Sequence, residues 1–201
     1  MKNPIATMKI KNGKEVKFEL FYEEAPESVK NFINLCKEKF YDSMYFWRVE
    51  PGKMIQTGCV DNDGTGPLAY CIKSECKNNG VNNNVKFIRG TLGLGRFEYN
   101  TENSDFYFVL EDCPKLDNEY VAFARVIEGM DEIDRIGSVD VEEYGFMHKA
   151  KEKVYIESLS VDTFGVEYGD PIKLKGFTKA ELVARMDESM EERKKTGYSA
   201  F

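Results

Sequence analysis

The sequence of 201 residues predicts a mainly β protein, in which short antiparallel strands close into a barrel and two helices cover it. Three observations support this fold class. Short segments with alternating apolar and polar residues recur along the chain, glycine and asparagine mark the turns between them, and two segments before the tail show helical spacing. Barrel closure removes the exposed strand edges that such a sheet would otherwise leave.

The first two strands are expected at residues 5–10 and 16–22, where apolar and polar residues alternate. Asn12 and Gly13 stand between these segments, and this dipeptide is a strong signal for a two-residue hairpin turn. A half-buried antiparallel sheet is therefore expected to begin at the N-terminal end of the chain.

A helix is expected to follow from Pro26. Proline is favoured in the first turn of a helix, where its missing N–H would have no partner in any case. The apolar residues that follow are three or four positions apart, so that they share one helical face toward the sheet. These residues are Val29, Phe32, Ile33 and Cys36.

The next hairpin contains a candidate functional arginine. Aromatic and β-branched residues over 44–49 predict a strand, residues 50–52 predict a turn, and residues 53–57 predict a second strand. This arrangement places Arg48 beside Gln56. An arginine offers five donors in a rigid fork, and a glutamine can accept from it while donating elsewhere. The pair can hold a guanidinium in place, whereas a solvated surface arginine is the alternative.

The remaining body of the domain is expected to contain a second short helix at residues 130–136 and a closing strand at residues 154–161. We place the domain at residues 1–163 and a C-terminal extension at residues 164–201.

The extension is expected to contain an amphipathic helix at about residues 178–194. Thr178 and Glu181 have the spacing of a capping box, in which each side chain bonds to the other residue's backbone N–H. A narrow apolar stripe then predicts that the helix lies against its own domain or against a partner. The stripe consists of Leu182, Val183, Met186 and Met190.

Composition excludes several functional classes. The 35 acidic and 28 basic residues give a net charge of −7, which disfavours nucleic acid as a partner. No apolar run approaches the roughly 20 residues that a membrane span needs, and the N-terminal residues lack the apolar core of a signal peptide. We therefore expect a cytoplasmic protein that does not bind membranes.

Neither a metal site nor a nucleophilic catalytic group is expected. The five cysteines are odd in number and scattered, as is typical of reduced thiols. Cys71 and Cys76 lie close in the sequence, but a structural zinc site needs about four ligands, and His148 is the only histidine. An isolated histidine does not form a Ser/His or Cys/His constellation. We expect no metal and no other cofactor.

Residues 46–58 resemble the signature of the cyclophilins, the peptidyl-prolyl cis-trans isomerases, which is approximately F-H-R-V-I-x-G-F-M-I-Q-G-G. Further blocks at residues 25–32, 90–108 and 116–126 are similar to the family in the same order, and the resemblance covers about residues 5–162. It implies a closed eight-stranded antiparallel cyclophilin barrel. The matching signature positions are Phe46, Arg48, Val49, Gly52, Met54, Ile55, Gln56 and Gly58.

The resemblance implies that Arg48 acts as the catalytic donor to the proline nitrogen and that Gln56 orients it. Arg96 occupies the position of an asparagine whose backbone contacts the residue before proline, and such a contact can survive a changed side chain. Gly95 beside it keeps the small size that a close approach of the peptide requires. Asp105 replaces a glutamine of the family and is expected to face the arginine. At about 4 Å and an effective dielectric constant near 20, such a pair attracts by roughly 4 kcal/mol before desolvation is counted.

The resemblance also implies an apolar slot for the proline ring, formed by Lys53, Met54, Tyr107 and Leu116 with Tyr120 at its rim. Lys53 stands where the family has an aromatic ring, and an ammonium group cannot be buried there without a partner. Its side chain is therefore expected to extend toward solvent and to leave a shallower, wetter slot.

Prolyl isomerisation in protein folding is the function that the resemblance favours. The alternative is a catalytically weak or inactive module of the same fold that binds proline-containing peptides or assists folding, with the catalytic step lost through Lys53, Asp105 and Tyr120. An assembly role of the tail helix is less favoured, because it leaves the retained site residues unexplained. We expect proline-containing peptides or unfolded proteins as partners and a monomer, with tail-mediated association left open.

Overall fold

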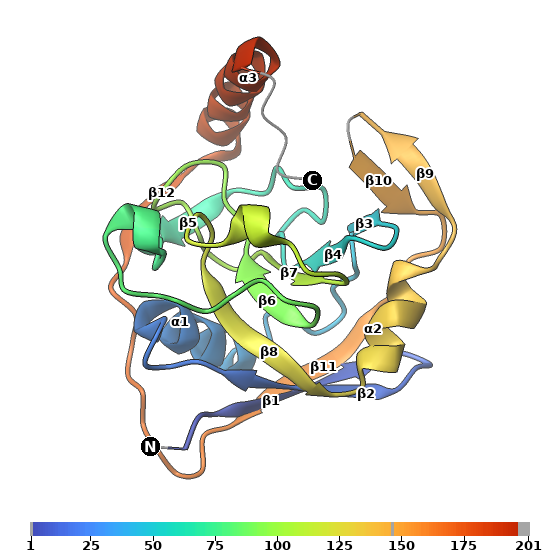
Figure 1. Cartoon of the computed structure of the whole chain (residues 1–201), viewed down its shortest axis with the longest axis vertical. Coiled ribbons are helices and arrows are strands. Elements are labelled where there is room, and N and C mark those ends of the chain that lie inside the picture. Colours follow the sequence, from blue (N-terminus) through green and yellow to red (C-terminus); the bar gives the residue numbers. More distant parts are fainter. Residues whose placement is uncertain (1, 146, 197–201) are drawn as a thin grey trace.

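Figure 1 shows the computed structural model, which describes residues 2–145 and 147–196. An eight-stranded sheet dominates it, with the order β11-β1-β2-β8-β6-β7-β4-β3, and each neighbouring pair is antiparallel. The mainly β character that the sequence predicts is confirmed. The strands are β1 (Ile5–Ile10), β2 (Glu15–Leu20), β3 (Arg48–Glu50), β4 (Met54–Thr57), β6 (Thr91–Leu94), β7 (Phe106–Val109), β8 (Ala122–Glu128) and β11 (Ile156–Asp162).

The sheet curls into a half barrel, so the closed barrel that we expected is not confirmed. β3 and β11 form the two edges and do not pair with each other in the described residues. Backbone hydrogen bonds connect the residues beside these edges: Ser43 N–H donates to Ile156 O at 2.9 Å, and Phe46 N–H donates to Val154 O at 3.1 Å. The edges therefore approach each other through single bonds and not through a continuous ladder.

The first hairpin forms where Asn12 predicts a turn, but its loop is one residue longer than expected. The register pairs Lys9 with Glu15, and Ile10 N–H donates to Lys14 O at 3.3 Å, which leaves three loop residues. Asn12 adopts a left-handed backbone with φ of 59°. Asparagine tolerates this conformation better than most residues, so it serves as the centre of the longer loop.

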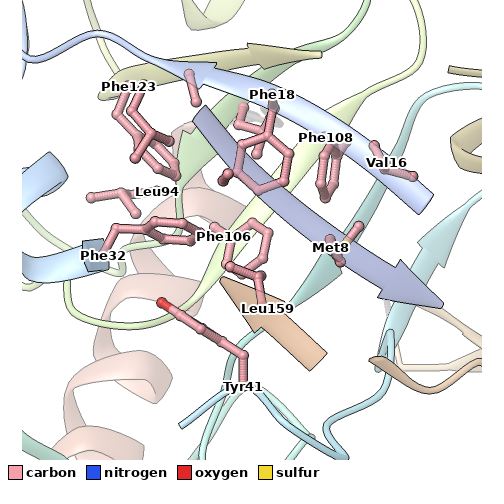
Figure 2. Packing of buried hydrophobic residues seen from close by; sticks show 14 of the residues in the cluster. Met8, Val16, Phe18, Phe32, Tyr41, Leu94, Phe106, Phe108, Phe123 and Leu159 are labelled. Atoms are coloured by element: carbon pink, nitrogen blue, oxygen red, sulfur yellow. The ribbon is translucent and has the colours of Figure 1, made fainter. Parts of the chain in front are cut away.

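Helix α1 (Pro26–Lys37) covers one side of the curled sheet and begins at Pro26 as predicted (Figure 1). Its residue Phe32 lies at the centre of an aromatic cluster (Figure 2). The ring centroid of Phe32 is 5.3 to 5.8 Å from the centroids of four other rings, which come from the sheet and from the loop after α1. These rings belong to Phe18, Tyr41, Phe106 and Phe123.

Helix α2 (Met130–Gly137) lies at the other end of the sheet, where the sequence predicts the second helix. It is followed by a hairpin of β9 (Val141–Tyr144) and β10 (Met147–Ala150), which our sequence interpretation did not include. β10 packs against β3. A histidine from late in the chain therefore reaches the strand that carries Arg48.

The C-terminal segment wraps around the domain before it reaches the site. Tyr168 packs edge-on against Tyr22 with ring centroids 4.7 Å apart. Strand β12 (Leu174–Phe177) then pairs antiparallel with β5 (Leu68–Cys71). Gly176 permits this close approach, because a Cβ at that position would lie 2.1 Å from the carbonyl oxygen of Leu68.

Helix α3 (Lys179–Thr196) begins with the predicted capping box. The Glu181 carboxylate accepts from the Thr178 N–H at 2.8 Å, and the Glu181 N–H donates to the Thr178 hydroxyl at 3.3 Å. Leu182 is 3% exposed against the chain's own domain, whereas Met190 of the expected stripe lies outside the described side chains. None of the described helices is both long enough and apolar enough to span a membrane. Two short 3₁₀ turns, Lys77–Asn79 and Pro114–Leu116, complete the helical segments.

Candidate functional site

Arg48 and Gln56 lie opposite each other on β3 and β4, as the hairpin predicts. The arginine Nη1 donates to Gln56 Oε1 at 3.4 Å, and its Nε donates to Glu50 Oε1 at 2.9 Å. The Arg48 side chain is 15% exposed. Two contacts on neighbouring strands therefore orient the guanidinium while part of it remains accessible.

Asp105 on the loop before β7 reaches the arginine through Gln56. The amide Nε2 of Gln56 donates to Asp105 Oδ2 at 3.0 Å, which leaves the amide oxygen directed at Arg48. Burial raises the pKa of Asp105 to about 7, against the opposing effects of the Gln56 amide, the Trp47 indole and the Arg48 charge. The protonation state of Asp105 therefore changes near neutral pH. Its hydrogen bond to Gln56 fixes the orientation of the glutamine amide.

Asp105→Asn is expected to stabilise the protein above pH 7. The folded chain holds a proton on this carboxyl between about pH 4 and pH 7, whereas the unfolded chain has released it. Unfolding then releases a proton, so stability falls as the pH rises through this range. We expect the variant to gain at least about 1 kcal/mol in urea unfolding at pH 8 and little at pH 4.

The exposed Asp140 provides the control for this prediction, because Asp140→Asn changes the same functional group in solvent. Burial also raises the pKa of Glu102 to about 7, so part of the pH dependence should persist in Asp105→Asn. If the unfolding free energy depends on pH equally in wild type and Asp105→Asn, the raised pKa of Asp105 is contradicted.

The sequence does not predict a second set of contacts beside the arginine, in which Glu50 binds Arg48 and His148 binds Glu50. His148 Nδ1 lies 2.7 Å from Glu50 Oε2, and the His148 N–H donates to Glu50 Oε1 at 3.3 Å. Burial acts to raise the pKa of Glu50, but hydrogen bonds from His148 and Arg48 outweigh it and leave the pKa lowered. The carboxylate therefore stays ionised beside the guanidinium.

The contact between Glu50 and Arg48 has one signal in the sequence. Glu50 follows Arg48 by two positions, and side chains at i and i+2 of a strand share one face. The turn predicted at residues 50–52 instead takes Glu50 off that face. The contribution of His148 has no local signal, because 98 positions separate it from Glu50.

Three of the predicted slot residues lie together in a separate apolar cluster beside the hairpin. Met54, Tyr107 and Leu116 are each exposed by 2% or less. Phe87 stacks on Tyr107 with centroids 6.0 Å apart and an interplanar angle of 15°. The cluster is thus apolar and preassembled, but it is covered by its neighbours.

Lys53 and Tyr120 lie at the margins of this cluster. Lys53 is exposed, in line with the expected path of its side chain toward solvent. The ring of Tyr120 meets Tyr107 edge-on, with centroids 6.3 Å apart, and its other neighbour is the Arg96 guanidinium, 4.5 Å from the ring centroid. Arg96 is further held by Glu119, at 2.7 Å, so its side chain packs into the surrounding loops.

A cavity of about 170 Å³ adjoins the arginine, and Met54, Tyr107 and Leu116 are not among the residues that line it. Five of the predicted site residues line it, so the structure brings these five together at one opening. They are Arg48, Gln56, Gly95, Arg96 and Asp105. Residues of α3 complete the wall, which the sequence analysis did not anticipate.

A family model described as cyclophilin type peptidyl-prolyl cis-trans isomerase/CLD matches residues 5–161. The chain is 35% identical over 142 residues to the peptidyl-prolyl cis-trans isomerase of Helicobacter pylori, covering 70% of this chain and 84% of that protein. It is 35% identical over 161 residues to the peptidyl-prolyl cis-trans isomerase B of Escherichia coli, covering 75% of this chain and 95% of that protein.

The fold is similar to a crystal structure of a cyclophilin type peptidyl-prolyl cis-trans isomerase from Cryptosporidium parvum. The TM-score is 0.71 at 24% identity, and the match covers 80% of this chain and 98% of that one. A second crystal structure of the same protein was determined in the presence of the dipeptide Ala-Pro. This likeness supports the curled sheet with its helices as a cyclophilin-like fold.

Proposed function

The chain belongs to the cyclophilin-type peptidyl-prolyl cis-trans isomerases, and from this premise we propose that Arg48 is the group through which it accelerates rotation about Xaa-Pro bonds. The substrates we propose are proline-containing segments of unfolded or partly folded proteins. We also propose the cytoplasm as the place of action, where the net charge of −7 favours solubility.

The reaction needs a fixed donor more than a reactive group. The cis and trans forms of an Xaa-Pro bond differ by only about 0.5–1 kcal/mol, but their exchange takes tens to hundreds of seconds. The barrier arises from amide resonance, which is lost when the bond twists. The proline nitrogen then gains lone-pair character, and a donor that meets this lone pair binds the twisted amide better than either planar form.

The main support for this proposal is that two hydrogen bonds hold the Arg48 guanidinium where it lines the cavity. Gln56 accepts from one end of the guanidinium, and Glu50 accepts from Nε. A donor that is already oriented loses little entropy when the amide twists against it. In this proposal Glu50, Gln56 and Asp105 are positioning residues and Arg48 is the catalytic residue.

The proline ring is proposed to contact the cluster of Met54, Tyr107 and Leu116 next to the arginine. These side chains supply the apolar surface that favours a pyrrolidine ring over water. Because each is exposed by 2% or less, the ring can reach them only if neighbouring side chains move, and Phe87 and Tyr120 are two of the neighbours of Tyr107. Substrate entry is therefore expected to require local rearrangement.

The test is the exchange rate of a short Xaa-Pro peptide, measured by NMR with catalytic amounts of the intact chain. Wild type is expected to broaden or exchange-couple the cis and trans resonances, and Arg48→Ala is expected to remove this effect. Binding shifts without accelerated exchange in wild type would instead indicate a peptide-binding module. Equal acceleration by both proteins would exclude Arg48 as the catalytic group.

A further inference from the structure

Helix α3 lies beyond residues 5–161 that match the family model, yet it forms part of the wall of the cavity beside Arg48. Two residues of the helix, Leu182 and Met186, face this cavity. They are four positions apart and therefore lie on one helical face. Val183 on the same helix is 37% exposed and does not line the cavity.

The helix is held in this position by contacts at its N-terminal half. The ring of Phe177, two residues before α3, meets Phe97 edge-on with centroids 5.6 Å apart. Lys179 pairs with Asp61, and Arg185 pairs with Glu98. Exposed ion pairs contribute little individually, but together these contacts fix the helix to the two loops that carry Asp61 and Glu98.

The cavity combines an apolar wall with the polar anchoring groups of the site. Trp47, Phe97, Leu182 and Met186 supply apolar surface, and Arg48 lies at the same opening. A cavity of about 150 Å³ with apolar walls accepts a benzene-sized group. The volume of about 170 Å³ is therefore suited to one aliphatic or aromatic side chain.

We propose that Leu182 and Met186 form the apolar wall of a subsite for one large apolar side chain that flanks the Xaa-Pro bond. This inference rests on the proposed function, because a peptide bound at Arg48 is what brings a flanking side chain to the cavity. The cavity is continuous with the arginine, so a single peptide can occupy both. The C-terminal extension thereby sets substrate preference in this chain.

The experiment uses pairs of Xaa-Pro peptides that carry leucine or alanine at one flanking position, tested on each side of the proline. At one of these positions, wild type is expected to prefer leucine by about tenfold in kcat/KM. Met186→Ala should remove most of this preference through the KM for the leucine peptide, with kcat unchanged. Met186→Leu should retain it, because the apolar volume remains. Val183→Ala, the matched control on the same helix, should behave as wild type.

The inference would be overturned by no leucine preference at any flanking position, by an unchanged preference in Met186→Ala, or by an equal loss in Val183→Ala. Increased activity of Met186→Ala toward both peptides alike would also overturn it, because the helix would then obstruct the site. The Met186 methyl resonance, assigned by its loss in Met186→Ala, gives a readout independent of turnover. A Met186 methyl resonance that shifts with the leucine peptide and not with the alanine peptide supports the subsite. If wild type at the same time fails to accelerate cis-trans exchange, the subsite is supported and the proposed function is contradicted.

Discussion

Arg48→Lys is expected to lower kcat/KM for Xaa-Pro isomerisation by about 10²–10³ although the positive charge is retained, which is the scale of losing one oriented donor to a transition state. Arginine presents planar donors to two partners at once, here Gln56 Oε1 and Glu50 Oε1. A lysine ammonium is a single point charge on a flexible stem and cannot reproduce this fork. It is expected to pair with the Glu50 carboxylate and to leave the amide nitrogen without a donor.

Arg89→Lys provides the matched control for this prediction. Arg89 pairs with Asp134 at 2.6 Å on the surface, with 45% of its side chain exposed, and it does not line the cavity. The same chemical change there should leave the isomerisation rate unchanged. If Arg48→Lys retains more than about one tenth of the wild-type rate, charge alone accounts for the effect and the anchored fork has no special role.

Phe32→Ala is expected to reduce the free energy of unfolding by about 3–5 kcal/mol, the range for truncating a buried phenylalanine. Phe32 is 1% exposed and contacts four aromatic rings, which join α1 to the sheet (Figure 2). Two of these rings pack edge to face with Phe32 and two are tilted against it, and rings packed so closely on four sides have little room to close a void. Urea unfolding followed by circular dichroism measures the loss.

The control for Phe32→Ala is Ile172→Ala, since Ile172 is 70% exposed and its truncation should change stability by about 0.5 kcal/mol or less. The outcome that would disagree with the described packing is a loss below about 1 kcal/mol for Phe32→Ala. Such a small loss would mean that the neighbouring rings collapse into the space that the phenylalanine leaves.

Features set by neighbours in the sequence could be predicted from the sequence. The pairing of Arg48 with Gln56 follows from a short turn between two strands, and the capping box of Thr178 and Glu181 follows from a spacing of three residues. The start of α1 at Pro26 has the same origin. In each case backbone geometry over a few residues determines which groups meet, so the local pattern is sufficient.

Features that depend on distant packing could not be predicted in this way. Only the folded chain brings His148 to Glu50 and Leu182 to the cavity beside Arg48, because nothing in a local period fixes which surfaces meet. The stacking of Phe87 on Tyr107 and the incomplete pairing of the sheet edges likewise depend on distant packing.

The sequence by itself therefore determined the family, most of the elements and the candidate catalytic arginine. The tertiary structure decided what holds that arginine, how far the neighbouring apolar residues are exposed and which segment forms the far wall of the cavity. The physical reason is that burial, pKa and cavity shape are properties of contacts between segments far apart in the chain, and the burial of Asp105 is one such contact.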